Sequence, residues 1–483
     1  MTASTATTPA TPQRSSALIT VLVLCFGGLG ASLTQTLVIP IQGDLPRLLS
    51  TSVSNAGWVV TVTLLAAAVA MPISGRLGDL FGKQRVLACT AGLLVVGSLV
   101  CAVSDSLAPL LAGRALQGLS MGFIPVGIAL MREVTPPHMT NTAIAAMSAT
   151  LGVGGAIGLP LSAWVAQTYD WHALFWMSAV VAGLILAGVV LLVPHVKDAV
   201  GGTFDAVGAV GLTVGLVATL VGVSKGNGWG WTSGRTVATI AGGVLVLLVW
   251  GVYELRQKAP LVDLRVTAAK PVLFTNIAAI AVGFGMMAQS IVVPQLLQLP
   301  KATGFGLGQT MLQAGLWMAP AGLVMMAFAP VSSRLMTLFG PKRTLMLGAG
   351  VLGVGYLVAF FLMNAPWQLL VASCVATAGV GIGYAAMPTL IMGAVPISEA
   401  GSAVGVNALM RSIGTTTAAA VMTAVLAGSA DASGVASKGA FELCFFIGAI
   451  AAFVGVAITA IVPHVHTRTL RPVAPVELEK AAS

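Results

Sequence analysis

The sequence reads Gly75-Arg-Leu-Gly-Asp-Leu-Phe-Gly-Lys-Gln-Arg85 between two long apolar runs, and a similar stretch, Ser333-Arg-Leu-Met-Thr-Leu-Phe-Gly-Pro-Lys-Arg343, lies between two others. Six of the eleven positions carry the same residue. This internal repeat predicts two equivalent halves, each with a basic loop between its second and third membrane helices. A chance match between two basic loops is the alternative.

The composition places the chain in a membrane. Hydrophobic residues make up 57% of the 483 residues and charged residues only 8%, whereas a soluble domain carries about 25% charged residues. A soluble fold, a disordered chain and a nucleic-acid partner are therefore excluded, although the net charge is +9. The five cysteines lie in apolar runs and have no metal-ligand pattern, and the histidines have no ligand spacing beyond His464-x-His466 in the C-terminal tail. We expect a lipid bilayer around the chain, no metal and no cofactor.

Apolar runs long enough to cross a bilayer, which requires about 20 residues, occur fourteen times. They cover residues 17–40, 57–74, 86–104, 107–131, 141–167, 171–194, 204–224, 236–253, 271–299, 310–332, 343–363, 367–395, 400–427 and 441–462. An interpretation with twelve spans, which omits the seventh and eighth runs, is the alternative.

The distribution of Lys and Arg predicts the orientation of these spans. With fourteen crossings, sixteen of the 23 basic residues fall on the side of the two termini. The five on the other side are Arg47, Lys225, Arg235, Lys301 and Lys438. The remaining two, Arg114 and Arg411, lie within spans. Because cytoplasmic loops are enriched in Lys and Arg, both termini are expected in the cytoplasm and the chain in the plasma membrane.

The repeat and the span count together predict the domain organisation. Two six-span halves account for spans 1 to 6 and 9 to 14, which leaves spans 7 and 8 as an inserted pair. The predicted parts are a disordered tail 1–16, a half 17–198, the inserted pair 199–255, a half 256–465 and a second tail 466–483. Parallel repeats of this kind imply a transporter whose site lies between the halves.

These residues carry a resemblance to a known family. The stretch 75–85 resembles the loop signature of the major facilitator superfamily, and Arg114, Gln117 and Gly118 resemble its R-x-x-Q-G motif. The 6+2+6 count is similar to the fourteen-span drug:proton antiporters of that superfamily. The resemblance implies an all-α polytopic membrane protein with the major facilitator fold. It also implies secondary active efflux of drugs or other amphiphilic small molecules, coupled to protons, by a chain that we expect to be a monomer.

The loop signature predicts a conformational latch. Its glycines permit a tight turn and close helix approach, and its Asp is an acceptor for a helix N-terminus or a cationic side chain. The predicted latch residues are Gly75, Arg76, Gly78, Asp79, Gly82, Lys83 and Arg85. For Lys83 and Arg85 the alternative is that they only set topology. In the second copy Thr337 replaces Asp79, so we expect a weaker latch there.

Polar residues inside spans are the candidates for a substrate or coupling site. A guanidinium within a span is costly unless it faces protein or water, so Arg114 and Arg411 are expected to face inward. Snorkelling to the interface is the alternative for both. The candidates for the cavity are Gln35, Arg114, Gln117, Asn407 and Arg411.

Small residues recur every four positions in the fifth span, and Gly154, Gly158 and Ser162 are predicted to form a stripe for helix packing. The antiporter motif resembled here would place Pro one residue earlier than Pro160. The first span also lacks the acidic residue that is usual in fourteen-span exporters. Asp79 and Glu133 are then the only acidic candidates for a proton carrier near transport-type motifs.

A membrane enzyme is the rival class, but the sequence contains no nucleophile signature and no catalytic constellation. The chain is therefore predicted not to be an enzyme. Within transporters, an uptake carrier or a metabolite exporter with a narrow substrate range is the alternative to multidrug efflux and antibiotic resistance.

Overall fold

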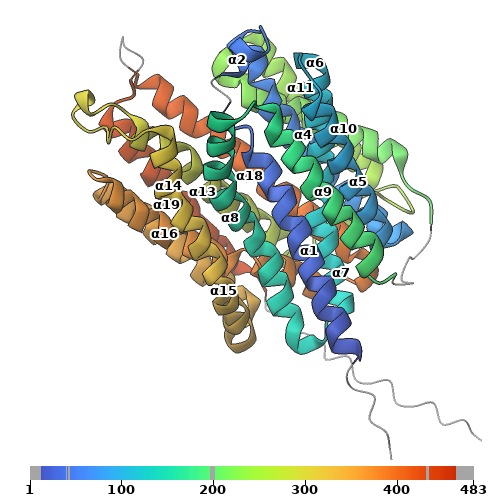
Figure 1. The fold of residues 1–483 in the computed structure, drawn as a ribbon. Helices are drawn as coiled ribbons and strands as arrows, with labels where there is room; N and C mark the ends of the chain where they lie inside the picture. The colour runs from blue at the N-terminus through green and yellow to red at the C-terminus, as the bar shows by residue number, and fades with distance from the viewer. Residues whose placement is uncertain (1–11, 40, 42–43, 196–201, 431–434, 464–483) are drawn as a thin grey trace, which may run out of the picture.

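The computed structural model describes all residues except 1–11, 40, 42–43, 196–201, 431–434 and 464–483. The described part of the chain consists of helices joined by loops (Figure 1). The first long helices are α1 (Pro12–Thr36), α4 (Trp58–Phe81), α5 (Lys83–Ala102), α6 (Leu107–Leu119), α7 (Phe123–Val134), α8 (Pro137–Thr168) and α9 (His172–Leu192). Next come α10 (Ala206–Trp229) and α11 (Gly234–Glu254). The last are α13 (Lys270–Gln298), α14 (Met311–Ala327), α15 (Ala329–Phe361), α16 (Pro366–Gly383), α17 (Ala386–Ala394), α18 (Ala400–Gly428) and α19 (Lys438–Ile461). Short helices α2 (Leu45–Leu48), α3 (Val53–Ala56) and α12 (Leu264–Thr267) lie in loops.

Several of these helices begin where the sequence supplies a cap. The side chains of Asp205, Ser233 and Ser437 accept hydrogen bonds from backbone N–H groups in the first turns of α10, α11 and α19. Thr310 and Gln313 form a reciprocal capping box at the start of α14. These caps satisfy N–H groups that have no partner within the helix, and so fix where the helix starts.

The described helices provide apolar segments for fourteen membrane crossings. Thirteen apolar segments are long enough to span, and one of them, Met311–Phe361, contains 51 residues. Gly340 interrupts this segment with a non-helical backbone (φ 79°, ψ 163°) and divides it into two crossings. The described helices agree with the prediction of fourteen spans, and α10 and α11, which the twelve-span alternative omits, are both apolar and long enough to span.

Glycine makes the same turn in both copies of the repeat. Gly82 separates α4 from α5 with φ +99°, and Gly340 occupies the equivalent position with φ +79°. Residues with a side chain rarely adopt this left-handed region, whereas glycine enters it without a steric cost. We call the end of the bundle that contains Gly82 and Gly340 the latch end.

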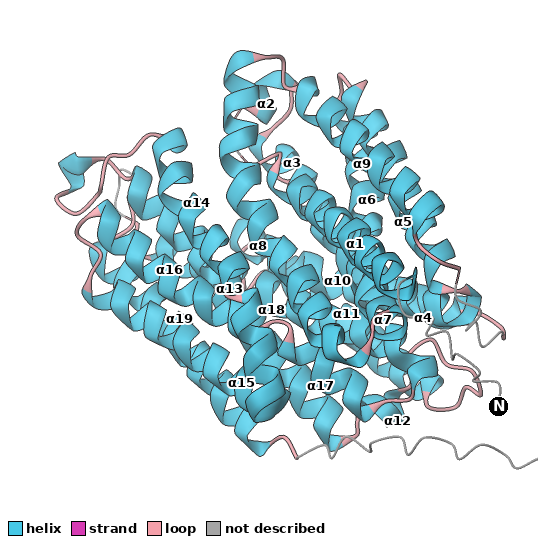
Figure 2. Ribbon diagram, turned by 60° about the horizontal axis from the view of Figure 1, so that its bottom comes forward, coloured by secondary structure: helices cyan, strands magenta, loops and turns pink. Residues whose placement is uncertain are grey.

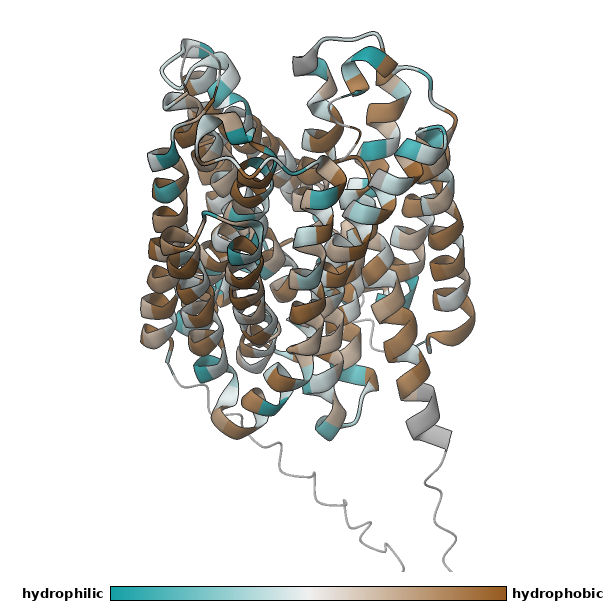
Figure 3. Ribbon diagram, turned by 60° about the vertical axis from the view of Figure 1, so that its left-hand side comes forward, coloured by the Kyte–Doolittle hydropathy of each residue, from teal (hydrophilic) through white to brown (hydrophobic). Residues whose placement is uncertain are grey.

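The spans form two groups that meet along two helix pairs. In the first group α1 packs on α8 and α9, and in the second α13 packs on α18 and α19 (Figures 1 and 2). The groups contact each other where α4 meets α18 and where α8 meets α14. Their ribbons diverge toward the end opposite the latch end, and hydrophobic residues cover the middle of the helices (Figure 3).

Helices α10 and α11 pack together beside this junction. Helix α10 lies against both α4 and α18, and Asn227 Nδ2 donates a hydrogen bond to the carbonyl of Ala420 at 3.1 Å. Helix α11 lies outside α10, with only 11% of its apolar window buried. The inserted pair thus contacts both six-span groups, while the exact domain bounds stay a prediction.

The two predicted tails fall mostly on residues 1–11 and 464–483, which lie outside the described part of the chain. Residues 12–16, predicted as tail, form the start of α1 instead. Proline is tolerated there because its missing N–H has no partner in the first turn of a helix.

Cysteine labelling should test the orientation of the inserted pair. A cysteine at Gly228, near the end of α10, should react with an impermeant thiol reagent added from outside, because the charge tally places this loop outside. A cysteine at Gln257, after α11, should react only from the cytoplasmic side. Labelling of both positions from the same side would contradict the orientation. The five native cysteines need to be replaced first.

Candidate functional site

The carboxylate of Asp79 joins the two six-span groups at the latch end. Asp79 lies in the last turn of α4 and is 1% exposed. Its Oδ1 accepts a hydrogen bond from Gly401 N at 3.1 Å, and its Oδ2 accepts one from Ser402 N at 2.8 Å. These N–H groups belong to the first turn of α18, where the helix dipole favours a negative charge. Asp79 therefore holds the N-terminus of α18 against α4.

Lys83 lies between two carboxylates behind this contact. Its Nζ is 3.5 Å from Asp79 Oδ1 and 2.6 Å from Glu133 Oε1, and all three side chains are buried. The lysine thus links Asp79 to the end of α7. Arg85, in contrast, is exposed. Asp79 and Glu133, the two predicted proton carriers, share one cation; their role in proton transfer stays a prediction.

Glycines allow α4 and α18 to cross closely beside Asp79. A Cβ on Gly75 would lie 2.1 Å from the carbonyl oxygen of Gly401, and one on Gly405 would lie 2.4 Å from the carbonyl oxygen of Met71. Gly78 has more room, since its nearest neighbour would be a Val126 methyl at 3.3 Å. Gly75 therefore serves the crossing between the groups, whereas Gly82 serves the turn.

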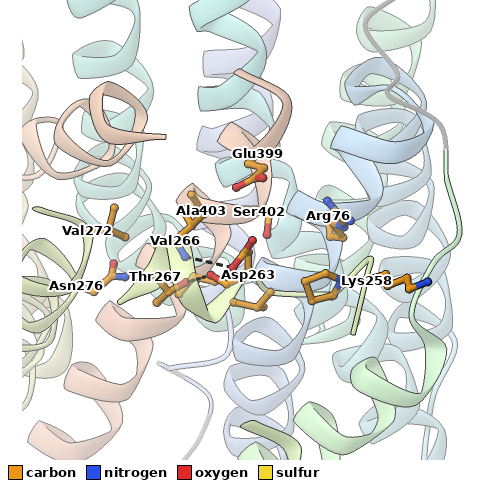
Figure 4. A pocket seen from close by; sticks show the side chains of 13 residues that line it. Arg76, Lys258, Asp263, Val266, Thr267, Val272, Asn276, Glu399, Ser402 and Ala403 are labelled. Carbon is orange, nitrogen blue, oxygen red and sulfur yellow. Dashed lines mark hydrogen bonds between the residues drawn. The ribbon is translucent and has the colours of Figure 1, made fainter. Parts of the chain in front are cut away.

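A polar cavity of about 130 Å³ adjoins this crossing (Figure 4). It is bounded by Arg76 of α4, by the linker after α11, by the start of α13 and by the first turns of α18. Its charged lining residues are Arg76, Lys258, Asp263 and Glu399. Both groups and the linker of the inserted pair thus meet around one cavity.

The second copy of the loop makes different contacts. Thr337, which replaces Asp79, is exposed, and its hydroxyl donates to the carbonyl of Ser333 in its own helix. The Ser333 hydroxyl lies 2.8 Å from that of Thr142 on α8, so this copy joins the groups through a neutral hydrogen bond. A neutral hydrogen bond is about half as strong as one to an ionised group.

Arg114 lies inside the first group of helices and is 1% exposed. Its Nε donates to the carbonyl of Val59 at 3.2 Å, and one terminal nitrogen donates to the carbonyl of Thr34 at 3.0 Å and to Gln117 Oε1 at 2.8 Å. Gln117 in turn donates to the hydroxyl of Ser98. The charge is therefore enclosed by α1, α4 and α6. Gln35, the residue after Thr34, is only partly buried.

Replacing Arg114 with Lys should destabilise the protein. The ammonium keeps the charge but cannot present donors to Val59, Thr34 and Gln117 in the fixed fork of a guanidinium. The loss of one charged hydrogen bond costs about 2 kcal/mol, so the apparent melting temperature of purified protein should fall. The matched change Arg235→Lys, at an exposed position, should leave it unaltered. An equal melting temperature for both variants would contradict this structural role.

A second buried polar network surrounds Arg411 in α18. One terminal nitrogen of Arg411 donates to Asn407 Oδ1 at 2.5 Å, and Asn407 Nδ2 donates to Asn276 Oδ1 at 2.9 Å. The guanidinium also lies over the ring of Tyr384, 4.5 Å from its centroid. Asn276 lines the cavity of Figure 4, so this network runs from the middle of α18 to the latch end.

The stripe on α8 packs against the end of α1. A Cβ on Gly154 would lie 2.3 Å from the hydroxyl of Ser32, and one on Gly158 would lie 2.0 Å from that of Thr36. Ser162 is fully buried, and its hydroxyl donates to the carbonyl of Gly158. These small residues let the two helices approach closely.

Sequence reasoning missed the partner side of the latch. The backbone N–H groups of Gly401 and Ser402 donate to the carboxylate of Asp79, and Gly405 lies against the backbone of α4 at the helix crossing. A small-residue spacing of four at 401 and 405 was a visible signal, but it does not identify the helix that it faces. Across the described ranges, no group of three or more His, Cys, Asp or Glu residues is placed to hold a metal ion.

Comparison with known proteins shows which family this chain matches. The profile of the Major Facilitator Superfamily matches residues 24–419 and 277–480. The probable actinorhodin transporter of Streptomyces coelicolor is 28% identical over 80% of this chain and 68% of its own length. The tetracenomycin C resistance and export protein of Streptomyces glaucescens is 28% identical over 71% of this chain and 63% of its own length.

The chain thus spans about two-thirds of the length of these two curated relatives. Among solved structures, the human organic anion transporter MFSD10 matches with a TM-score of 0.64 and 16% identity, over 93% of this chain and 99% of that one. At this identity the likeness concerns the fold alone.

Proposed function

This chain belongs to the major facilitator superfamily, and from that premise we propose that it exports drugs or other amphiphilic small molecules across the plasma membrane by alternating access. As a member of that family it is a multi-pass membrane transporter and not an enzyme. Export, rather than uptake, is supported by the similarity to the tetracenomycin C resistance and export protein of Streptomyces glaucescens.

Alternating access is supported by the position of the contacts that join the two groups. The two backbone N–H groups of α18 that donate to α4 reach the carboxylate of Asp79 at the latch end, and the ribbons separate toward the opposite end (Figure 3). Helices α4 and α18 meet at one buried carboxylate and a glycine crossing, and their separation would leave the packing of α1 on α8 and α9, and of α13 on α18 and α19, in place. We infer that this structure represents the state closed at the latch end.

Proton coupling is part of the proposal, with Asp79 and Glu133 as the acidic candidates. Both lie at the latch end around Lys83. The buried side chains of Arg114 and Arg411 are held by hydrogen bonds to protein groups, and the proposal assigns them to substrate binding or structure and not to proton transfer.

The deciding experiment is transport in proteoliposomes with and without an imposed pH gradient. Cells expressing the chain are first screened against a broad compound panel to find substrates, and the purified protein is then tested with the compounds found. Gradient-driven accumulation that a protonophore abolishes is the expected result.

Two other outcomes have definite meanings. Protection of cells against only one compound class would favour the alternative, a metabolite exporter with a narrow substrate range. Accumulation that is insensitive to the protonophore would contradict proton coupling.

A further inference from the structure

Two carboxyl groups face each other where α10 and α11 meet at the latch end. Asp205 caps α10, and its Oδ1 accepts hydrogen bonds from Gly208 N at 2.8 Å and from the Tyr253 hydroxyl at 3.0 Å. Glu254 is the last residue of α11 and is 2% exposed. Its Oε2 accepts from Leu261 N at 3.0 Å. Each carboxyl group therefore has one oxygen fixed by donors.

The other two oxygens are buried without a hydrogen-bond partner. They are Asp205 Oδ2 and Glu254 Oε1. A Cβ on Gly208 would lie 2.5 Å from the first and 2.4 Å from the second, so the two oxygens are within about 5 Å of each other.

The basic residues on the neighbouring elements do not neutralise these two carboxyl groups. Within the described ranges neither Asp205 nor Glu254 forms an ion pair. In the linker, Arg265 donates to the carbonyl of Leu255, Arg256 is exposed and Lys258 lines the cavity of Figure 4.

The helices packed against the pair add two further cations. They are Arg76 of α4, in the same cavity, and Arg411 of α18, which contacts Asn407 and Tyr384. Two ionised carboxylates whose facing oxygens are buried and within about 5 Å of each other repel strongly, and one shared proton removes that repulsion.

Hydrogen bonds connect this pair to the latch. Glu254 holds the linker at Leu261 N, the carbonyl of Leu261 accepts from the Ser402 hydroxyl at 3.4 Å, and Ser402 N donates to Asp79. The chain of contacts therefore runs from the inserted pair, through the linker and the first turn of α18, to α4.

We propose that Asp205 and Glu254 bind one proton between them, and that this proton-binding site keeps the linker in place and the latch closed. Loss of the proton leaves two negative charges on facing carboxylates, whose repulsion moves Glu254 away from Leu261 and frees the first turn of α18. The site does not require transport to be proton-driven, and it gives the inserted pair a function that the two six-span groups alone lack.

Glu254→Gln is the sharpest test, because the amide mimics the protonated state. Its N–H groups can donate to Asp205 Oδ2 while its oxygen still accepts from Leu261 N. Spin labels at His138 and Arg343, in full-length protein without native cysteines, report the separation of the groups at the latch end. In otherwise wild-type protein, the open population should rise by about tenfold between pH about 6 and about 8. In Glu254→Gln it should stay low at both values.

Asp205→Asn is the second variant, since it can donate to Glu254 Oε1 and should give the same pH-independent closed state. Glu442→Gln, a change of a partly exposed acid that forms an i,i+4 pair with Lys438, should behave like the wild type. An infrared band of a protonated carboxylic acid should be present in the wild type and lost in Glu254→Gln.

The proposal fails if the wild type shows no pH-dependent opening, if Glu254→Gln opens with pH as the wild type does, or if the infrared band is unchanged. These readouts measure conformation and protonation, so they stand apart from whether the chain exports drugs.

Discussion

Replacing Asp79 with Asn should reduce transport by at least about tenfold while the protein still inserts into the membrane. The change removes the charge that faces the N-terminus of α18 and the ion pair with Lys83, but it removes no apolar packing. Charge-assisted hydrogen bonds and the helix dipole together contribute about 2 to 4 kcal/mol in a buried site. Since 1.4 kcal/mol is tenfold in an equilibrium constant, the latch-closed state should become minor.

The measurement is the initial rate of substrate efflux, divided by the amount of protein in the membrane. Asp44→Asn is the matched control, because Asp44 is an exposed carboxylate whose ion pair with Arg47, at 3.8 Å, lies on the surface. Wild-type efflux from Asp79→Asn at equal abundance would refute the latch.

Replacing Gly75 with Val should abolish closure of the latch and thereby transport. The first carbon of any side chain at position 75 would lie 2.1 Å from the carbonyl oxygen of Gly401 and 2.6 Å from its carbonyl carbon. These atoms belong to the backbone of α18, so they cannot move aside as a flexible side chain would. Helices α4 and α18 must separate, which carries Gly401 N and Ser402 N away from Asp79.

Gly92→Val provides the same change on α5, where an added Cβ meets nothing within 4 Å. It should transport at about the wild-type rate. Gly75→Ala should already impair transport, because the clash begins at Cβ. Transport by Gly75→Val at the rate of Gly92→Val would show that closure does not require this crossing.

Much of the fold followed from local features of the sequence. The apolar runs predicted the spans because a bilayer requires that length of helix, and the repeat at 75–85 and 333–343 predicted the paired turns. Gly82 and Gly340 take the same left-handed backbone in both copies. The 51-residue helical segment Met311–Phe361 alone would suggest one element, but the aligned repeat identified its division at Gly340.

The sequence predicted one half of the candidate site, Asp79 and its loop, but not the helix that contacts it. The motif drew attention to Asp79 as an acceptor for a helix N-terminus or a cation, and the structure supplies both, at Ser402 N and at Lys83. Which helix would come to Asp79 depends on packing between residues that are distant in the chain. Arg114 illustrates the same limit. It donates to the backbone carbonyls of Val59 and Thr34, and because every residue has a backbone carbonyl, the side chains at these positions do not identify them as partners.

By itself the sequence determined that this protein is a fourteen-span membrane transporter. Hydropathy sets each membrane span and glycine sets each tight turn, and both effects are local to one helix or one turn. Only the tertiary structure decided that α18 is the partner of Asp79 and that Gly401 and Gly405 form the crossing with α4. It alone brought Asp205 together with Glu254 beside Gly208. Contacts of this kind join helices that are far apart in sequence, and they are selected by the shape of the packed surfaces, which no single helix carries in its own pattern.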